Sequence, residues 1–228
     1  MKIIDISGPV YTGMWNYPEP LGSKLGAFSL EKLEFEFGGQ KYFVDTFKGM
    51  KAQTGTHIET PGRYLEGNDY KVSDIHIKDL FLREAYVFNI PYKDLKEKDG
   101  KKYIDLDDLK QAQKEEIKEN SGILIGTGYG SSNWDKKDFF ERSWFFKKEA
   151  MQYLISLKPF LLGTDSGEWE NTKNPEGIFK MFFPANILIL APCINIEKVS
   201  RFKANITIFP FNVEGSYISP VRAVITEQ

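Results

Sequence analysis

The chain has 228 residues, of which 41% are hydrophobic and 27% charged, and its formal net charge is −2. This length suits one substantial hydrophobic core, so we expect a single domain over residues 1–228. A net charge so close to zero gives no global attraction to nucleic acid or to an anionic membrane, and we expect neither as a partner. The sequence has no apolar run of the roughly 20 residues that span a bilayer and no signal-peptide pattern at its start, so we expect a cytoplasmic protein.

The first half of the chain shows strand patterns. Apolar and polar residues alternate over residues 33–37, and β-forming residues dominate residues 42–47. Gly38-Gly39 between these segments is typical of a hairpin turn. A further strand is expected at residues 85–90, where Pro91 ends it.

Helical patterns enter in the second half, between short strands. Asp105 is placed to cap one helix, whose modest apolar stripe extends to Ile117. Apolar residues at helical spacing predict a second helix over residues 146–158, and Asn174-Pro175 predicts the start of a third. Strands are expected at residues 122–126, 160–163, 204–211 and 221–226. Together these elements predict an α/β fold with a mixed sheet and with its helices in the second half of the chain.

One segment, residues 53–64, carries side chains suited to metal chemistry. Side chains two residues apart share a face of an extended chain, so Gln53, His57 and Glu59 are expected on one side. An imidazole nitrogen with carboxylate and amide oxygens makes a half-site suited to manganese or zinc. The spacing alone also fits a structural histidine that forms hydrogen bonds with its neighbours.

The same segment resembles the signature His-x-Gly-Thr-His-x-Asp-x-Pro-x-His-Phe of the cyclase family of metal-dependent hydrolases, which includes bacterial kynurenine formamidases. Gly55, Thr56, His57 and Pro61 match the signature, and Glu59 stands in place of its aspartate. Further resemblances follow in the family's order at residues 3–10, 124–129, 162–165 and 214–224. The resemblance implies a swivelling β/β/α domain, assembled as a homodimer or homotetramer, that hydrolyses amide bonds with bound zinc or manganese.

The chain departs from that family at several functional positions. The first motif histidine, a metal ligand in the family, is Gln53, and the histidine regarded as the general base is Arg63. A guanidinium cannot accept a proton from water, but it can clamp a substrate carboxylate. The positions of a second-metal histidine and glutamate hold Phe179 and Ala191, which have no ligating atoms.

These changes reduce the expected site to one divalent metal per subunit, manganese or zinc, held by His57, Glu59 and Gln53. A carboxylate from Asp165, Glu168 or Glu170 is expected to replace the base, and Glu168 is favoured because its apolar neighbour Trp169 would raise its pKa. The loop that carries these acids is equally consistent with a solvated acidic turn.

Two functions from different classes follow. The first, which we favour at this stage, is a metal-dependent hydrolase of an amide or lactam bond in a small carboxylated substrate, similar to an arylformamidase, with Arg63 binding the carboxylate. The second is a family member without catalytic activity that binds a small molecule or serves as a scaffold. The aromatic residues Trp15 and Tyr17 are expected either to fill the core or to stack on a ring-bearing substrate.

Overall fold

The fold is built on a closed, mixed sheet. In the computed structural model, which describes residues 1–19, 21–64 and 68–227, eight strands pair in the order β1-β13-β12-β5-β8-β10-β11-β4. These strands are β1 (Lys2–Asp5), β4 (His57–Glu59), β5 (Arg83–Asn89), β8 (Gly122–Gly126), β10 (Leu161–Thr164), β11 (Leu188–Ala191), β12 (Lys203–Pro210) and β13 (Ile218–Glu227). Strands β5, β8, β10 and β11 run parallel to one another. Because β4 pairs with both β11 and β13, the sheet closes on itself.

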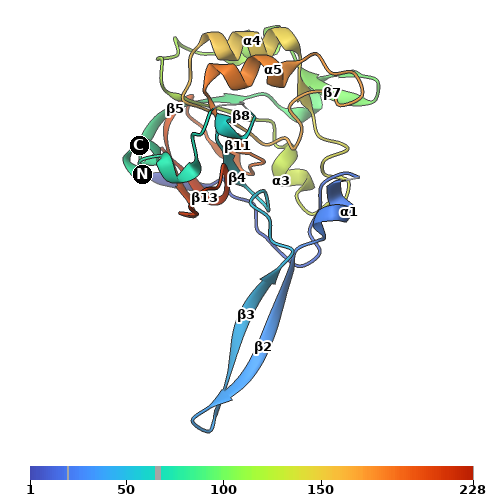
Figure 1. The fold of residues 1–228 in the computed structure, drawn as a ribbon. Helices are drawn as coiled ribbons and strands as arrows, with labels where there is room; N and C mark the ends of the chain where they lie inside the picture. The colour runs from blue at the N-terminus through green and yellow to red at the C-terminus, as the bar shows by residue number, and fades with distance from the viewer. Residues whose placement is uncertain (20, 65–67, 228) are drawn as a thin grey trace.

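The α-helices of the described residues are α1 (Leu21–Leu25), α2 (Leu106–Ala112), α3 (Tyr129–Asn133), α4 (Lys148–Ser156) and α5 (Ile178–Phe182). Helices α4 and α5 lie side by side above the strands (Figure 1). A small second sheet joins β6 (Lys96–Lys98), β7 (Lys101–Ile104) and β9 (Phe145–Phe146). In the described part of the chain, no helix has both the length and the apolar character needed to cross a membrane.

Strand β8 shows how the sheet separates two apolar clusters. Ile123 and Ile125 belong to the cluster on the helical side, which also contains Leu154 of α4. Leu124, between them, belongs to the second cluster, together with Ile58 of β4. Both faces of this strand are therefore buried, which is typical of parallel strands covered on both sides. The predicted α/β fold, with a mixed sheet and its main helices in the second half, is confirmed.

The first predicted helix cap is confirmed. The Asp105 carboxylate accepts hydrogen bonds from the backbone N–H groups of Asp107 and Asp108 and begins α2. The helix ends at Ala112, earlier than the apolar stripe to Ile117 predicted.

Two other helix starts differ from their predictions. Phe146 lies on β9, where it pairs with Ile104, so α4 begins only at Lys148. Helix α5 begins at Ile178 instead of next to Asn174-Pro175. The Glu170 carboxylate accepts hydrogen bonds from the backbone N–H groups of Gly177 and Ile178, so this helix takes its cap from outside the local pattern.

The predicted hairpin is confirmed and is longer than its sequence pattern indicated. It consists of β2 (Ser29–Phe37) and β3 (Gln40–Lys48), joined by Gly38 and Gly39 with φ of 61° and 74°. Positive φ at both turn positions favours glycine and suits a two-residue hairpin turn. The hairpin projects away from the body of the molecule (Figure 1).

Candidate functional site

Strand β4 fixes the direction of the motif side chains. Its residues pair with β11 on one edge and β13 on the other, with His57 opposite Ala191 and Glu59 opposite Ile189 in β11. Ile58 packs into the apolar cluster on the far side of the sheet. The side chains of His57 and Glu59 therefore point together to the opposite side, and each residue is only 5% exposed.

Backbone constraints explain why glycine and threonine precede this strand. Gly55 has a φ of 69°, and a Cβ atom at this position would lie 2.8 Å from the Val10 side chain. The Thr56 hydroxyl donates to the Pro192 carbonyl oxygen at 2.7 Å and accepts from the Gly8 N–H at 3.0 Å. These two residues thus hold β4 against the start of the chain and against the segment after β11.

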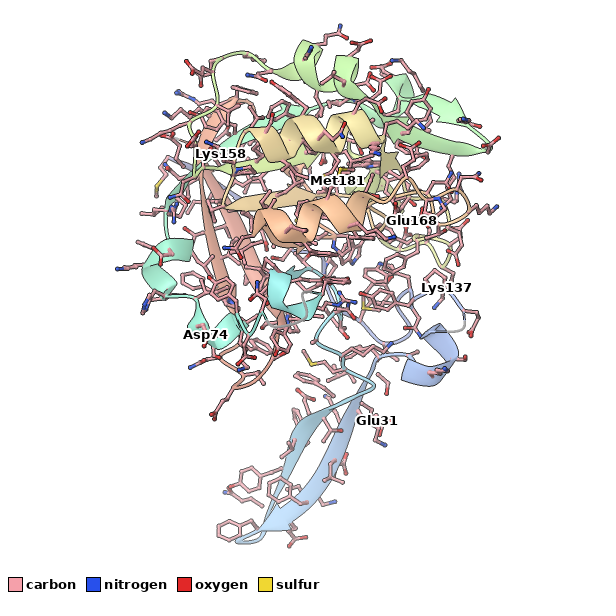
Figure 2. All side chains as sticks on the ribbon, turned by 45° about the horizontal axis from the view of Figure 1, so that its top comes forward. Glu31, Asp74, Lys137, Lys158, Glu168 and Met181 are labelled. Atoms are coloured by element: carbon pink, nitrogen blue, oxygen red, sulfur yellow. The ribbon has the colours of Figure 1, made fainter. Side chains whose placement is uncertain are left out.

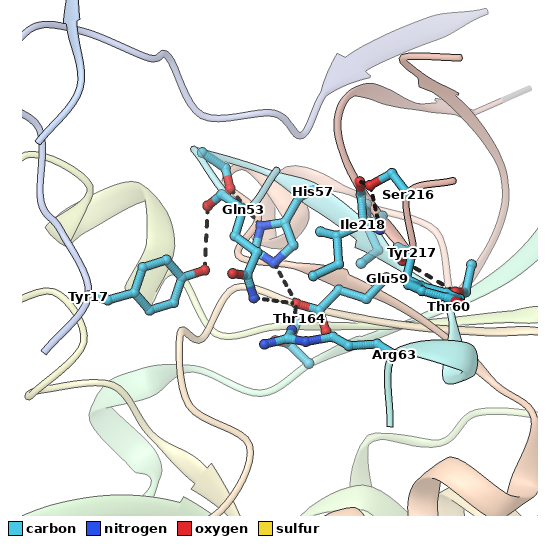
Figure 3. A network of polar contacts seen from close by, with 12 residues as sticks. Tyr17, Gln53, His57, Glu59, Thr60, Arg63, Thr164, Ser216, Tyr217 and Ile218 are labelled. Carbon is cyan, nitrogen blue, oxygen red and sulfur yellow. Dashed lines mark hydrogen bonds and ion pairs between the residues drawn. The ribbon is translucent and has the colours of Figure 1, made fainter. Parts of the chain in front are cut away.

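The Glu59 carboxylate is the centre of a polar cluster (Figure 3). Its Oε1 atom lies 3.1 Å from His57 Nε2 and 3.0 Å from Gln53 Nε2. A 3₁₀ turn at Pro61–Arg63 then carries the chain back, and Arg63 Nη1 donates to the same oxygen. A buried carboxylate needs such partners, since an unpaired buried charge is strongly destabilising.

These partners set the charge of the cluster. Burial raises the pKa of Glu59, but the contacts with His57, Arg63 and Gln53 outweigh it and hold that pKa at about 2. His57 Nδ1 lies 2.9 Å from the Gly55 carbonyl oxygen, so both ring nitrogens face atoms that only accept hydrogen bonds. These two contacts fix the orientation of the imidazole beside Glu59.

The cluster opens onto a cavity of about 170 Å³. Glu59 is the one acidic side chain among the described residues that line it. The remaining walls are mainly aromatic, formed by Tyr17, Tyr64, Phe140, Trp169 and Phe179. Tyr64 stacks on Phe183 with ring centroids 3.6 Å apart, and the Arg63 guanidinium lies 4.6 Å from the centre of the Tyr64 ring. The cavity therefore combines a charged cluster with flat apolar surfaces.

The structure does not bring Asp165 to this cavity. Its carboxylate is fully buried and accepts hydrogen bonds from the Thr127 N–H, the Thr127 hydroxyl and Trp144 Nε1 at 2.8–3.0 Å. Burial raises the pKa of Asp165 to about 6 despite these donors. Asp165 joins β8, β10 and the loop before β9, and we assign it a structural position in place of the predicted catalytic one.

Glu168 is also directed elsewhere. Gly167 and Trp169, its neighbours on both sides, line the cavity, whereas Glu168 forms an ion pair with Lys101 of β7. Burial raises the pKa of Glu168, and Lys101 opposes that effect. The predicted substitution of the missing base by Glu168 therefore lacks the required geometry, because its carboxylate is paired outside the cavity.

The residues present do not fit a bound divalent metal. Glu59 Oε1, the oxygen nearest His57 and Gln53, already accepts a hydrogen bond from Arg63. The guanidinium therefore already neutralises the carboxylate that a metal ion would need as a ligand. Phe179 and Ala191 line the cavity without ligating atoms. Within residues 1–19, 21–64 and 68–227, no group of at least three His, Cys, Asp or Glu residues is placed to hold a metal. The expected manganese or zinc centre of His57, Glu59 and Gln53 is therefore not supported by this donor set.

The two aromatic residues expected either in the core or against a substrate differ in position. Tyr17 lines the cavity. Trp15 lies in the core, where it stacks on Phe139 with ring centroids 5.0 Å apart. The place of Tyr64 in the cavity wall was not predicted from the sequence. Its position directly after Arg63 was the available signal, because a guanidinium beside an aromatic ring often stacks on it.

Comparisons with known proteins find one matching family model and several similar solved structures. A family model described as "Putative cyclase" matches residues 4–171. A predicted metal-dependent hydrolase from Bacillus stearothermophilus superposes with a TM-score of 0.71 at 20% identity, covering 98% of this chain and 97% of its own. Isatin hydrolase A from Labrenzia aggregata, bound to benzyl benzoate, gives 0.76 at 15% identity over 98% and 93% of the two chains. An isatin hydrolase bound to the product analogue thioisatinate gives 0.77 at 16% identity over 100% and 93%. No curated protein matches the chain.

These similarities confirm the predicted cyclase-type swivelling β/β/α fold. At 15–20% identity they show the fold alone, so the chemistry of the pocket rests on this chain's own residues.

Restoring the two family histidines should create a metal site in this pocket. We expect the wild-type protein, purified without chelator, to hold well below one equivalent of zinc or manganese by elemental analysis. The double variant Gln53→His/Arg63→His should bind zinc close to one equivalent, because it adds two imidazoles and removes the guanidinium from Glu59.

Adding His57→Ala to that double variant is the control and should remove the metal again. Stoichiometric zinc in the wild type, lost in His57→Ala, would contradict the assignment.

Proposed function

The chain belongs to the putative cyclase family, and we propose that it uses its pocket to bind a small, flat ring compound that carries a carboxylate. The observation that carries this proposal is the placement of Arg63, between the buried Glu59 and the aromatic walls of the cavity.

Shape supports a flat ligand. Aromatic rings from separate parts of the chain face the cavity, which has a volume of about 170 Å³ and is suited to a compound of one or two rings. Stacking of a ligand ring on Tyr64 or Tyr17 would retain the offset or edge-on geometries that aromatic pairs prefer. Solved relatives named isatin hydrolases hold benzyl benzoate or thioisatinate, which are ring compounds as well.

Charge supports a carboxylate. The guanidinium of Arg63 has several N–H donors in a planar fork, and its contact with Glu59 is made through Nη1. The Arg63 side chain is 29% exposed, so it reaches both the buried acid and the cavity opening. The guanidinium charge of Arg63, inside a low-dielectric cavity, attracts an anion more strongly than the same charge does in water.

We expect Arg63→Ala to weaken binding of benzoate far more than binding of benzamide, which has the same shape without the charge. Loss of a hydrogen bond to a charged group costs about 1.5–3 kcal/mol, which corresponds to a loss of roughly tenfold to a hundredfold in affinity. Isothermal titration calorimetry of both compounds measures the difference.

Arg63→Lys is the matched control, since it keeps the charge but loses the planar fork. Its affinity for benzoate should lie between those of the wild type and Arg63→Ala. Equal weakening of benzoate and benzamide in Arg63→Ala would show that Arg63 acts on pocket shape and not on the ligand's carboxylate.

Hydrolysis of an amide or lactam bond is the second candidate. It is favoured by solved relatives whose names describe metal-dependent or isatin hydrolases. In this pocket Arg63 stays protonated and the pKa of Glu59 is about 2, so neither side chain can take a proton from water.

Because a general base contributes roughly 10²–10⁴ in rate, we expect only weak turnover of lactams, aryl formamides and N-formyl amino acids, with or without added zinc or manganese. Rapid turnover of any member of this panel, abolished in His57→Ala, would make hydrolysis the primary function instead.

A further inference from the structure

The loop after β10 forms part of the cavity wall and is held from outside the cavity. Gly167 and Trp169 both line the cavity. Glu168, between them, is directed to the other side of the loop, where its carboxylate accepts a hydrogen bond from Lys101 Nζ. Figure 2 shows Glu168 on the side of the molecule that carries the hairpin of β6 and β7. The loop therefore has one side in the cavity and the other side on that hairpin.

The ion pair between Lys101 and Glu168 is shielded from water. The two side chains are only 12% and 11% exposed. Removing one partner of such a pair leaves an uncompensated buried charge, which is strongly destabilising. Lys96, in the same hairpin, pairs with Asp105 instead, and its side chain is 47% exposed. Of these two ion pairs, the one that reaches the cavity loop is therefore the one whose loss has the larger effect.

Short contacts connect Glu168 to the cavity wall. Ser166 Oγ accepts from the Glu168 N–H at 3.1 Å and donates to the Glu168 carbonyl oxygen at 3.0 Å. The next residue, Trp169, packs its ring against Phe146 of β9 and Phe182 of α5, with ring centroids 5.8 and 5.6 Å apart. Because these contacts leave no free length of chain, a displacement of Glu168 also displaces Trp169.

The cavity wall has little tolerance for such a displacement. A Cβ atom at Gly167 would lie 2.6 Å from the Phe140 ring, so the loop already packs closely against that ring. Phe140 in turn stacks on Tyr17 with ring centroids 4.8 Å apart, and both rings line the cavity. A small shift of the loop therefore changes the space that the aromatic walls leave for a flat ligand.

We propose that Lys101 is a positioning residue for the ligand cavity, and that its ion pair with Glu168 holds Gly167 and Trp169 in place in the cavity wall. This inference rests on the function proposed above, because it describes how that cavity keeps its shape. Arg63 supplies the charge that binds a carboxylate, whereas Lys101 acts only on shape. Loss of Lys101 therefore weakens charged and neutral ligands alike.

Protonation of Glu168 removes the same ion pair. Burial raises the pKa of Glu168, Lys101 lowers it, Glu141 raises it and Lys173 lowers it. The ionised carboxylate is the form that holds the loop. The affinity for a flat ligand is therefore complete above this pKa and declines as the pH falls through it.

The experiment measures affinity for benzamide and benzoate by isothermal titration calorimetry at neutral pH. Lys101→Met should weaken both ligands by the same factor, roughly twofold to thirtyfold. Lys101→Arg keeps the charge and should stay close to the wild type. Lys96→Met is the matched control, because it makes the same substitution in the same hairpin at a lysine that pairs with Asp105, and it should bind like the wild type. Wild-type affinity in Lys101→Met would overturn the proposal.

A pH series with benzamide, which carries no carboxylate, separates Glu168 from other titrating groups. The affinity of the wild type should decline on acidification. Glu168→Gln should bind benzamide weakly already at neutral pH and show no such decline, although His57 and Asp165 are unchanged in it. A decline that persists in Glu168→Gln would assign the pH dependence to another group and refute the proposal.

A readout without ligand distinguishes failure of this proposal from failure of the proposed function. In protein labelled with fluorotryptophan, Trp169→Phe identifies the Trp169 resonance in the fluorine NMR spectrum, and the other tryptophan resonances report whether each variant is folded. The Trp169 resonance should move on acidification of the wild type. In Lys101→Met it should already be displaced at neutral pH, whereas in Lys96→Met it should not.

This pattern, in a protein that binds neither benzoate nor benzamide, would refute the proposed function and support the positioning role of Lys101. A folded Lys101→Met variant with an unchanged Trp169 resonance would refute the positioning role, whatever the ligand.

Discussion

The structure of the pocket depends on how one buried carboxylate is neutralised. Glu59 lies on a strand whose other face is packed into the core, so its charge cannot turn towards water. Arg63, four residues later, supplies the compensating charge together with His57 and Gln53. Once the guanidinium holds that position, the carboxylate is already neutralised, and a divalent cation would compete with Arg63 for the same oxygen. Arg63 also lines the aromatic cavity, where its guanidinium lies over the ring of Tyr64.

The fold makes this arrangement rigid. Strand β4 closes the sheet by pairing with β11 and β13, so a shift of His57 or Glu59 would disturb both neighbours. The turn before the strand is fixed by the positive φ of Gly55 and by hydrogen bonds of the Thr56 hydroxyl. Gly55 and Thr56 thus stabilise this backbone turn independently of which ligand binds in the pocket. Their presence therefore supports the family's fold, whereas Gln53 and Arg63 decide which chemistry that fold can perform here.

Local patterns predicted those parts of the structure that local forces determine. The hairpin follows from alternating residues around Gly38-Gly39, and α2 follows from the cap at Asp105. The start of α5 was missed because Glu170 caps it from outside the helix. The direction of the Glu168 side chain could not be predicted from local sequence either, because its partner Lys101 is distant along the chain. In the site, spacing placed His57 and Glu59 correctly on one face, but their partners depended on a turn that folds Arg63 back.

The central claim is that Arg63 gives this pocket the positive charge that a metal provides in a metal-dependent hydrolase. The most direct measurement is the calorimetric affinity of the wild-type protein for benzoate, first in excess chelator and then in saturating zinc. We expect the same dissociation constant in both conditions, because the carboxylate contacts the guanidinium and not a metal. Binding that vanishes in chelator and returns with zinc would contradict it.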